Sequence, residues 1–323
     1  MAQIVDYLKV AALAGGVGGA KLAHGLAQCL LPEKLTVIVN TGDDFKHLGL
    51  YICPDLDTVC YTLAGINNPA TGWGREGETW HAMQNIAALG GPDWFNLGDK
   101  DLATHLERTR RLHAGQTLSQ ITNDFCRAWG NKACILPMSD DPVQTWVETD
   151  RGELIFQEYF VRYQCQPIVK GFSFQGAEQA KPAPGVIDAL TEADLIIICP
   201  SNPWVSIQPI LSVAGIKQAM ERKIVIAVSP LIAGQALKGP AAKMYHEMGI
   251  EPSAYAVAQH YHTLISGFIL DNSDKILAAE IEVIGIHPYV TDIVMHSIAD
   301  RARLAWETIQ FGEELLSSRK SRR

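Results

Sequence analysis

The sequence predicts an α/β fold, with a Rossmann-like, mostly parallel sheet, helices on both faces and a largely helical insertion. Two observations indicate this fold class. An apolar run at residues 9–13 ends in a glycine-rich turn, and a helix-like stretch with Leu22, Leu26 and Leu30 on one face follows. A strand, a glycine turn and a helix in this order begin a nucleotide-binding unit. Several later apolar runs are continuous, which is typical of strands covered on both faces.

Similar apolar runs predict the remaining strands. Leu35–Val39 is the second strand, and further runs lie at residues 133–136, 194–199, 223–228 and, as the last, Ile281–Ile284. Residues 145–149 and 154–160 alternate around Asp150-Arg151-Gly152 and predict a hairpin. Several of these strands end in small polar or acidic turns, so we expect a ligand outside the carboxyl ends of the sheet.

Residues 58–130 show helical periodicity. Helix-like segments at 79–89, 102–112 and 118–129 are separated by polar loops, and no long linker flanks them. We therefore expect a single domain over residues 1–323. Its parts are a core of about residues 8–58 and 131–290, a helical insertion at about 59–130, and a C-terminal helix with a basic tail at 291–323.

Composition favours a globular enzyme over several other classes. The chain has 323 residues, of which 47% are hydrophobic and 19% charged, and its formal net charge is −8, which disfavours nucleic-acid binding. No uncharged apolar run reaches the roughly 18 residues that a membrane span needs, and the N-terminus lacks the pattern of a signal peptide. The seven cysteines form no Cys-x-x-Cys pair, as expected for reduced thiols in a cytoplasmic protein.

The glycine turn after the first strand is a candidate phosphate site. Glycines let backbone N–H groups approach a phosphate at a helix N-terminus. The turn is not a Walker loop because Leu22 follows the lysine, and it does not match the dinucleotide fingerprint. Asn40 stands where an acidic ribose-binding residue is expected, so a nucleotide phosphate is predicted but NAD is not. A tight turn without ligand is the alternative. The candidate residues are Gly15, Gly16, Gly18, Gly19 and Lys21.

Four carboxylates follow the second strand in two turn-rich segments: Asp43, Asp44, Asp55 and Asp57. Like charges raise one another's pKa, so such a cluster requires a cation. Oxygen ligands together with a substrate phosphate suit Mg²⁺. Not all four can be ligands, because Asp57 can instead cap the helix that follows it and Asp55 can be purely structural.

Further motifs are open to two interpretations. Asp101 is predicted to cap a helix, while Lys100 and His105 can face the cleft. Trp73 can stack on a planar ring and Arg75 can pair with phosphate, or their loop can simply pack on its own tryptophans. No Gly-x-Ser-x-Gly elbow provides a hydrolase nucleophile.

Taken in order, the motifs resemble those of the 2-phospho-L-lactate transferase family of coenzyme F420 biosynthesis. The resemblance covers residues from about 9 to 284. It rests on Gly15-Gly-Val-Gly-Gly-Ala-Lys-Leu, Asn40-Thr-Gly-Asp-Asp, Pro54-Asp-Leu-Asp-Thr, Gly98-Asp-Lys-Asp-Leu-Ala-Thr-His, Leu136-Pro-Met-Ser-Asp-Asp-Pro-Val and Pro200-Ser-Asn-Pro.

The resemblance implies a reaction. The terminal ribityl hydroxyl of the deazaflavin Fo attacks a guanosine diphosphate-linked three-carbon acid, the phospho-acid moves to Fo, and GMP leaves in a Mg²⁺-dependent step. The acid is phospholactate, phosphoenolpyruvate or phosphoglycerate, and the sequence leaves this choice open. The family also suggests a homodimer.

The resemblance also assigns roles to residues. The glycine turn would hold the diphosphate, and Asp57 and Lys100 match positions that contact Fo. Asp57 and Asp44 would be catalytic, and Asp43, Asp44 and Asp57 would hold Mg²⁺. The guanosine side would be contacted by Ser139, Asp140, Ser201 and Asn202, with Asp140 reading the guanine N–H groups.

Two other functions are weighed against this one. A related non-enzymatic group binds nucleotide-sugars and regulates cell-envelope metabolism, but full matches to the Gly98 and Trp73 motifs are not expected there. An NAD(P) oxidoreductase is disfavoured by the broken fingerprint.

Overall fold

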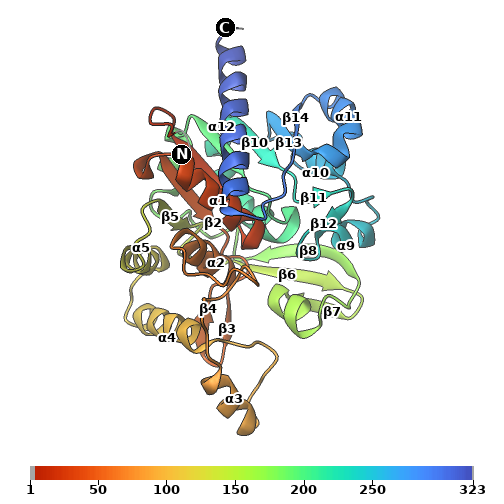
Figure 1. Cartoon of the computed structure of the whole chain (residues 1–323). Coiled ribbons are helices and arrows are strands. Elements are labelled where there is room, and N and C mark those ends of the chain that lie inside the picture. The colour runs from red at the N-terminus through yellow and green to blue at the C-terminus, as the bar shows by residue number, and fades with distance from the viewer. Residues whose placement is uncertain (1–3, 322–323) are drawn as a thin grey trace.

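A seven-stranded parallel sheet forms the centre of the computed structural model, which describes residues 4–321 (Figure 1). The strand order is β14-β13-β10-β9-β1-β2-β5, and every neighbouring pair is parallel. This confirms the predicted Rossmann-like α/β class. The strands are β1 (Val10–Ala14), β2 (Leu35–Val39), β5 (Cys134–Pro137), β9 (Leu195–Ile198), β10 (Ile224–Val228), β13 (Gly267–Asp271) and β14 (His287–Thr291).

Helices cover both faces of this sheet because its strands are apolar on both sides. Along β1, Val10, Ala12 and Ala14 join one core, whereas Ala11 and Leu13 join another, since successive side chains point to opposite faces. The first core is closed by α1 (Gly16–Cys29), α2 (Pro54–Leu63), α5 (Leu118–Ala128) and α12 (Ile298–Ser321). The second is closed by α6 (Val186–Glu192), α7 (Gln208–Ser212), α8 (Ile216–Met220), α9 (Ala241–Glu247), α10 (Ala254–His260) and α11 (Ala278–Val283).

The strand order reverses between β1 and β9. From β1 the chain moves outward through β2 to β5, and from β9 it moves in the opposite direction through β10 and β13 to β14. A crevice forms outside the carboxyl ends of the strands at such a switch point. The glycine turn follows β1 and Ser201 follows β9, so both lie at this crevice.

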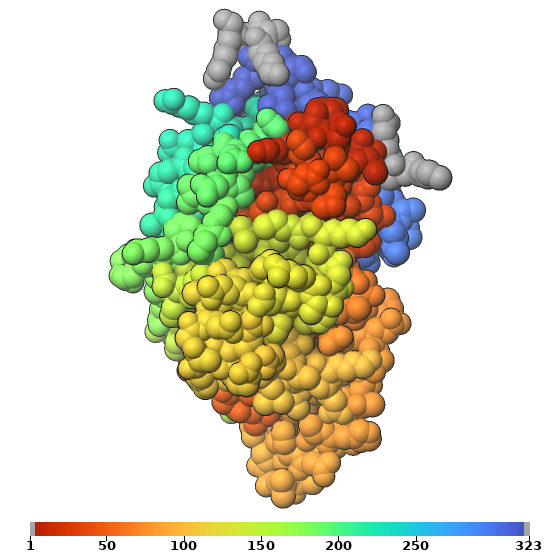
Figure 2. Space-filling model, turned by 90° about the vertical axis from the view of Figure 1, so that its left-hand side faces the viewer, coloured from red at the N-terminus to blue at the C-terminus, as the bar shows by residue number. Residues whose placement is uncertain are grey.

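The segment after β2 builds one end of the molecule. It contains the hairpin β3 (Phe45–His47) and β4 (Leu50–Ile52), then α2, α3 (His81–Ala88), α4 (Asp99–His113) and α5. The orange and yellow part of the chain forms the lower end of the molecule in Figure 2, where Figure 1 places α3 and α4. The three helical segments predicted for this region are present.

A second, three-stranded sheet has the order β7-β6-β8. The predicted hairpin is confirmed as β6 (Gln144–Thr149) and β7 (Gly152–Ile155), but its second strand is shorter than expected. A π-helical turn at Glu158–Arg162 replaces its last part, and the unpredicted β8 (Val169–Gln175) pairs with the other edge of β6. Tyr159 is fully buried in that turn and packs in a small core with Phe156 and Val147.

The predicted last strand at Ile281–Ile284 is wrong. Residues 278–283 form α11, and the last strands are β13 and β14. Ile281 and Ile284 are three residues apart, so both meet the same core from one face of a helix. The C-terminal helix α12 begins at Ile298 and not near residue 291. Of the predicted basic tail, residues 319–321 continue α12, while Arg322 and Arg323 lie outside the described residues.

We predict that Gly18→Ala destabilises the fold. A Cβ at residue 18 would lie 2.3 Å from the backbone oxygen of Pro200, which cannot move aside without shifting the loop after β9. The expected loss is about 1–3 kcal/mol in the free energy of unfolding, measured in urea. Gly171→Ala is the control, because its Cβ would meet only the flexible carboxylate end of Glu148. Equal stability of the two variants would contradict the prediction.

Candidate functional site

The glycine turn is tied to the loop after β9 across the switch point. Gly15 is extended, with φ −152°, and Gly16 adopts a left-handed φ of 60° that favours glycine. The Gly15 N–H donates to Ser201 Oγ at 3.1 Å, and that hydroxyl donates to the Gly15 carbonyl at 2.7 Å. Ser201 therefore fixes the turn at the N-terminus of α1.

Packing alone already demands glycine at most of these positions. A Cβ would lie 2.5 Å from Asp55 Oδ2 at Gly15 and 2.5 Å from Ser201 Oγ at Gly19. The turn therefore has a structural reason for its composition, and phosphate binding there stays a prediction. Lys21 lies beyond the turn in α1, where its ammonium donates to the Met295 carbonyl at 2.9 Å.

All four carboxylates of the predicted cluster are buried. Asp43 and Asp44 follow β2, while Asp55 and Asp57 lie in the first turn of α2, and each is at most 7% exposed. Burial, and then the charge of Asp55, raise the pKa of Asp43 well above its usual range. Burial also raises the pKa of Asp44 well above its usual range, with added repulsion from Asp57 and Asp55.

Asp55 is a structural residue in this arrangement. Its Oδ2 accepts from Asn40 Nδ2 at 2.9 Å, and Asn40 also donates to the Val205 carbonyl at 3.1 Å. Burial raises the pKa of Asp55 to about 6, while hydrogen bonds from Asn40, the Gly16 N–H and Ser206 limit that rise. Asp55 thus links the end of β2, the glycine turn and the loop after β9.

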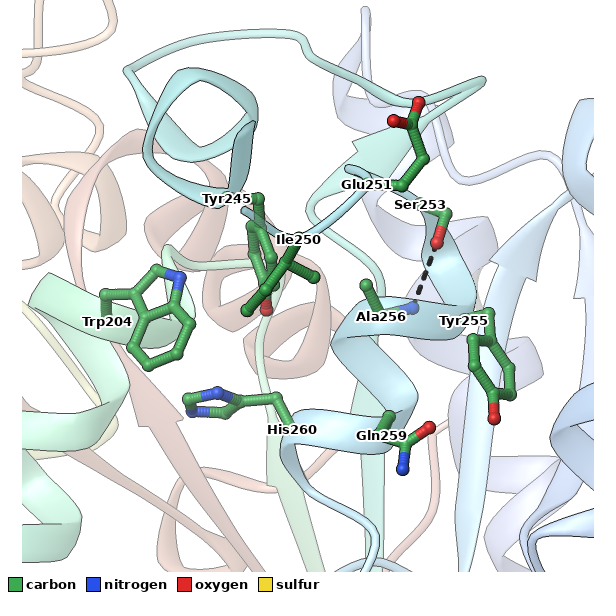
Figure 3. Close-up of a pocket in the computed structure, with 9 residues that line it drawn as sticks. All are labelled: Trp204, Tyr245, Ile250, Glu251, Ser253, Tyr255, Ala256, Gln259 and His260. Carbon is green, nitrogen blue, oxygen red and sulfur yellow. Dashed lines mark hydrogen bonds between the residues drawn. The ribbon is translucent and has the colours of Figure 1, made fainter. Parts of the chain in front are cut away.

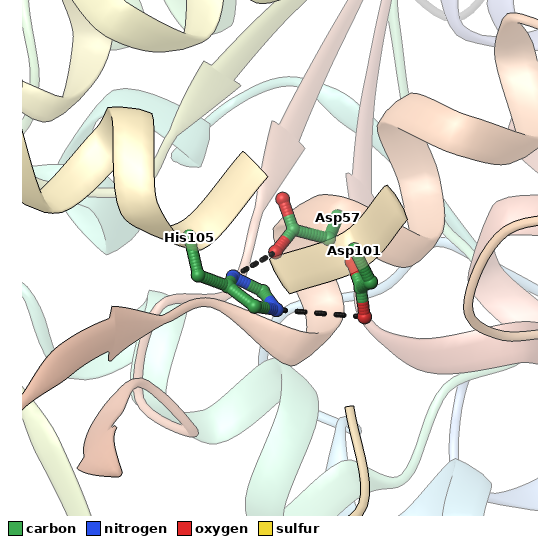
Figure 4. Close-up of side chains that lie close together, drawn as sticks. All are labelled: Asp57, Asp101 and His105. Atoms are coloured by element: carbon green, nitrogen blue, oxygen red, sulfur yellow. Dashed lines mark ion pairs between the residues drawn. The ribbon is translucent and has the colours of Figure 1, made fainter. Parts of the chain in front are cut away.

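Asp57 carries an ion pair with a buried arginine from the insertion. Arg108 on α4 donates through Nη1 to Asp57 Oδ2 at 3.0 Å and through Nη2 to Oδ1. His105 Nδ1 lies 3.7 Å from Asp57 Oδ2, and its Nε2 lies 3.4 Å from Asp101 Oδ2 (Figure 4). Burial raises the pKa of Asp57, and Arg108 opposes that rise.

The sequence interpretation missed Arg108, although a signal was present. Asp101, His105 and Arg108 are spaced i, i+4 and i+7, so they share one face of α4. The predicted cap roles are wrong, because Gly98 is the N-cap of α4 and Cys53 is that of α2. Asp101 instead accepts from the Tyr61 hydroxyl at 2.7 Å.

Oxygen atoms without partners surround the remaining two carboxylates. Asp43 Oδ1, both oxygens of Asp44, and the hydroxyls of Thr41 and Thr145 are buried and make no hydrogen bond. Buried polar atoms normally have partners, and an all-oxygen set of this kind suits a hard divalent cation. Among the described residues, Asp57, Asp101 and His105 bring three ligand atoms within 4.8 Å of one another, but Arg108 already holds both oxygens of Asp57. Mg²⁺ at Asp43 and Asp44 stays a prediction, which their unpartnered oxygens favour.

The other predicted site residues lie in three places. Lys100 is exposed, and its ammonium donates to the Glu76 carbonyl at 2.8 Å.

Asp140, beyond β5, accepts from the Ser119 N–H at 2.7 Å and from the Ser119 hydroxyl at 2.8 Å. Ser139 Oγ donates to the Lys181 carbonyl at 2.7 Å. Asn202 accepts from the Trp204 N–H at 2.9 Å. The structure thus brings Ser201 to the glycine turn, whereas Ser139 and Asp140 follow β5, two strands from β1 at the edge of the sheet.

Two cavities border this region. One, of about 550 Å³, is lined by Asp44, Tyr51, Gln144 and other residues between the β3–β4 hairpin and the small sheet. The other, of about 520 Å³, lies beside α9 and α10, where Trp204, Tyr245 and His260 point toward one another (Figure 3). Each of these three side chains leaves a buried polar atom without a partner. Both cavities fall in the size range of small-molecule sites.

Comparison with known proteins identifies the family of the chain. Residues 10–304 match the family described as 2-phospho-L-lactate transferase CofD. The chain belongs to this family. It is 43% identical over 317 residues to a protein of Streptomyces griseus subsp. griseus named phosphoenolpyruvate transferase, covering 95% of this chain and 99% of that one. A protein of the same name from Thermobifida fusca is 44% identical over 300 residues, covering 88% and 93%.

The fold also has a solved counterpart. The crystal structure of protein BH3568 from Bacillus halodurans aligns with a TM-score of 0.62 and 16% identity, covering 94% of this chain and 99% of that one. At this identity the likeness concerns the fold alone. Within residues 4–321, no helix is both long and apolar enough to cross a membrane.

We predict that Arg108→Met costs about 3–5 kcal/mol in the free energy of unfolding, because it leaves the Asp57 carboxylate buried without its counter-charge. Chemical denaturation at neutral pH measures the loss. The double variant with Asp57→Asn should recover most of it. Failure of the second substitution to restore stability would show that Arg108 acts through packing instead of charge.

We predict that Asp44→Asn stabilises the metal-free protein. The folded-state pKa of Asp44 is raised, so the folded state holds this proton over a wider pH range, and stability falls as pH rises above about 4. At pH 8 in EDTA the variant should gain about 1–3 kcal/mol, and the gain should shrink when Mg²⁺ is added. Asp140→Asn is the control, since that carboxylate already has its partners, and it should show no gain.

Proposed function

We propose that this protein transfers a phospho-three-carbon-acid group from a guanosine diphosphate-linked donor to the terminal ribityl hydroxyl of the deazaflavin Fo, releasing GMP in coenzyme F420 biosynthesis. The observation that carries the proposal is the set of buried oxygens at Asp43 and Asp44, beside a glycine turn at a helix N-terminus. Phosphoryl transfer depends mainly on positioning and on neutralising charge, and this arrangement supplies both.

The carboxylates have different roles in the proposed mechanism. Asp43 and Asp44 would hold Mg²⁺, which supplies charge neutralisation at the diphosphate. Asp44 also borders the cavity of about 550 Å³ and has two oxygens without partners, so it is well placed to accept the proton of the attacking hydroxyl. Asp57, held by Arg108, would orient the Fo side chain from the side of the site that α2 and α4 form.

The two substrates approach from different sides of the crevice. The backbone N–H groups at the start of α1 would bind the diphosphate, since a helix N-terminus favours anions. The acceptor would lie toward α2 and α4, where Asp57 and Lys100 are located. The relatives named phosphoenolpyruvate transferase favour an enolpyruvyl acid as the transferred group.

GMP release is expected only when Fo, a divalent cation and a guanylated acid are all present. Chromatography of GMP measures turnover, and mass spectrometry of the Fo-linked product made with each acid identifies the preferred donor. Product from the enolpyruvyl donor should dominate. Tight binding of a nucleotide-sugar, with no Fo binding and no GMP release, would instead favour a regulatory protein.

We predict that Asp43→Asn and Asp57→Asn each lower turnover by about 10²-fold or more, because each removes a preorganised charge at the reacting group. Circular dichroism and thermal unfolding verify that the variants are folded. Glu192→Gln at the end of α6 is the control, since its exposed carboxylate pairs with Lys9 just before β1, at the amino ends of the strands. Turnover near that of the wild type in either site variant would remove that residue from the mechanism.

A further inference from the structure

Two cysteines from different helices meet inside the protein, close to the carboxylate site. Cys60 on α2 and Cys126 on α5 place their Sγ atoms 3.5 Å apart, although 66 positions separate them in the chain. Both thiols are free, and both side chains are buried. Among the described residues, they are the only two thiols that form a hydrogen bond with each other.

One residue ties together the backbone segments that carry these two thiols. The Asn131 N–H donates to the Cys126 carbonyl at 2.9 Å, and the Asn131 side-chain amide donates to the Cys60 carbonyl at 3.1 Å. Beside them the rings of Tyr61 and Trp129 pack edge to face, with their centroids 5.1 Å apart. The end of α5 is therefore held against α2, and this packing keeps the two sulfur atoms in contact.

The two thiols differ in acidity. Their mutual hydrogen bond lowers the pKa of Cys126, whereas the same bond, together with burial, raises the pKa of Cys60 well above its usual range. The thiolate is the nucleophilic form of cysteine, and redox-active sites place such a sulfur next to a second thiol that resolves it. The exposed fractions are 6% for Cys126 and 2% for Cys60, so only a small oxidant fits this pair.

We propose that Cys60 and Cys126 form a redox-active dithiol, which a small peroxide oxidises to an intramolecular disulfide. The Cys126 thiolate attacks one peroxide oxygen, the O–O bond breaks, and the departing hydroxide takes up a proton and leaves as water. The Cys60 sulfur then attacks the sulfenic sulfur, an S–S bond forms, and the sulfenic hydroxide leaves as a second water with the Cys60 proton. The thiols lose two electrons in total, and the peroxide gains them.

The disulfide changes the geometry around Asp57. An S–S bond is about 2.0 Å long, so α2 and α5 must shift to bring the sulfur atoms together from 3.5 Å. Cys60 lies one turn beyond Asp57 on α2, and Cys126 follows Phe125, whose ring centroid lies 6.0 Å from the Arg108 guanidinium. Oxidation therefore acts on both partners of the Asp57–Arg108 ion pair. Its effect on the acceptor side of the site rests on the proposed function.

Peptide mapping of the folded protein after treatment with hydrogen peroxide tests the dithiol. The remaining thiols are blocked with iodoacetamide before digestion, and the expected product is a disulfide-linked pair of peptides that carry Cys60 and Cys126. Cys126→Ser should abolish this product. Cys29→Ser is the control and should leave it unchanged, because Cys29 lies at the end of α1, where its thiol contacts the Ala302 carbonyl.

The exposed Cys134 provides an internal comparison in the same digest. It is the first residue of β5, which packs against α5. Oxidation of Cys134 without a link between Cys60 and Cys126 overturns the proposal. A disulfide between Cys126 and Cys134 overturns it as well, because Cys60 is then not the resolving thiol.

GMP release by the oxidised protein tests the consequence for the site. The rate should fall at least about tenfold, since small displacements at reacting groups are costly, and dithiothreitol should restore it. Cys126→Ser should keep its rate after peroxide treatment. A mapped disulfide with an unchanged rate supports the dithiol but removes its effect on the acceptor side. If the reduced wild type releases no GMP, the proposed function fails, and the mapping alone decides the dithiol.

Discussion

The burial of negative charge beyond β2 is the constraint on which the rest of the site depends. Carboxylates removed from water must be paired, hydrogen-bonded or neutralised. Asp57 is balanced by Arg108, and Asp55 is held by hydrogen bonds. Among the described residues, Asp43 Oδ1 and both oxygens of Asp44 make no hydrogen bond. The four carboxylates of this short segment thus differ in how their charge is balanced. Asp43 and Asp44 are the two that we propose to bind a cation.

This constraint also gives the helical insertion a role beyond covering the sheet. Arg108 lies on α4, and its charge reaches the first turn of α2 from outside the central fold. The insertion therefore provides the counter-charge for Asp57 and, in the proposed mechanism, one wall of the acceptor site.

Sequence reasoning found those parts of the site that local patterns encode. The glycine turn and the four carboxylates stand out because short motifs after apolar strands carry them. The spacing of Asp101, His105 and Arg108 marks one face of α4, but it does not say that Asp57 meets this face, because Asp57 and Arg108 are 51 residues apart and meet only through tertiary packing. Lys21 was grouped with the glycine turn because the two are adjacent in sequence. Its ammonium donates to the Met295 carbonyl, and its role in nucleotide binding stays a prediction. The Ile281 segment was misread because two apolar residues beside glutamates fit a strand and a helix face equally well.

The hydrogen bonds between Gly15 and Ser201 have a consequence for the order of events during synthesis. They join residues 186 positions apart, and β1 pairs with β9 over a similar span. Contacts between distant residues form slowly because a long loop must first be closed. A nascent chain therefore has its glycine turn long before it has the loop that fixes it. The crevice at the switch point is therefore absent until β9 and Ser201 have been synthesised, so a ligand that binds there can stabilise the finished fold but cannot guide its early steps.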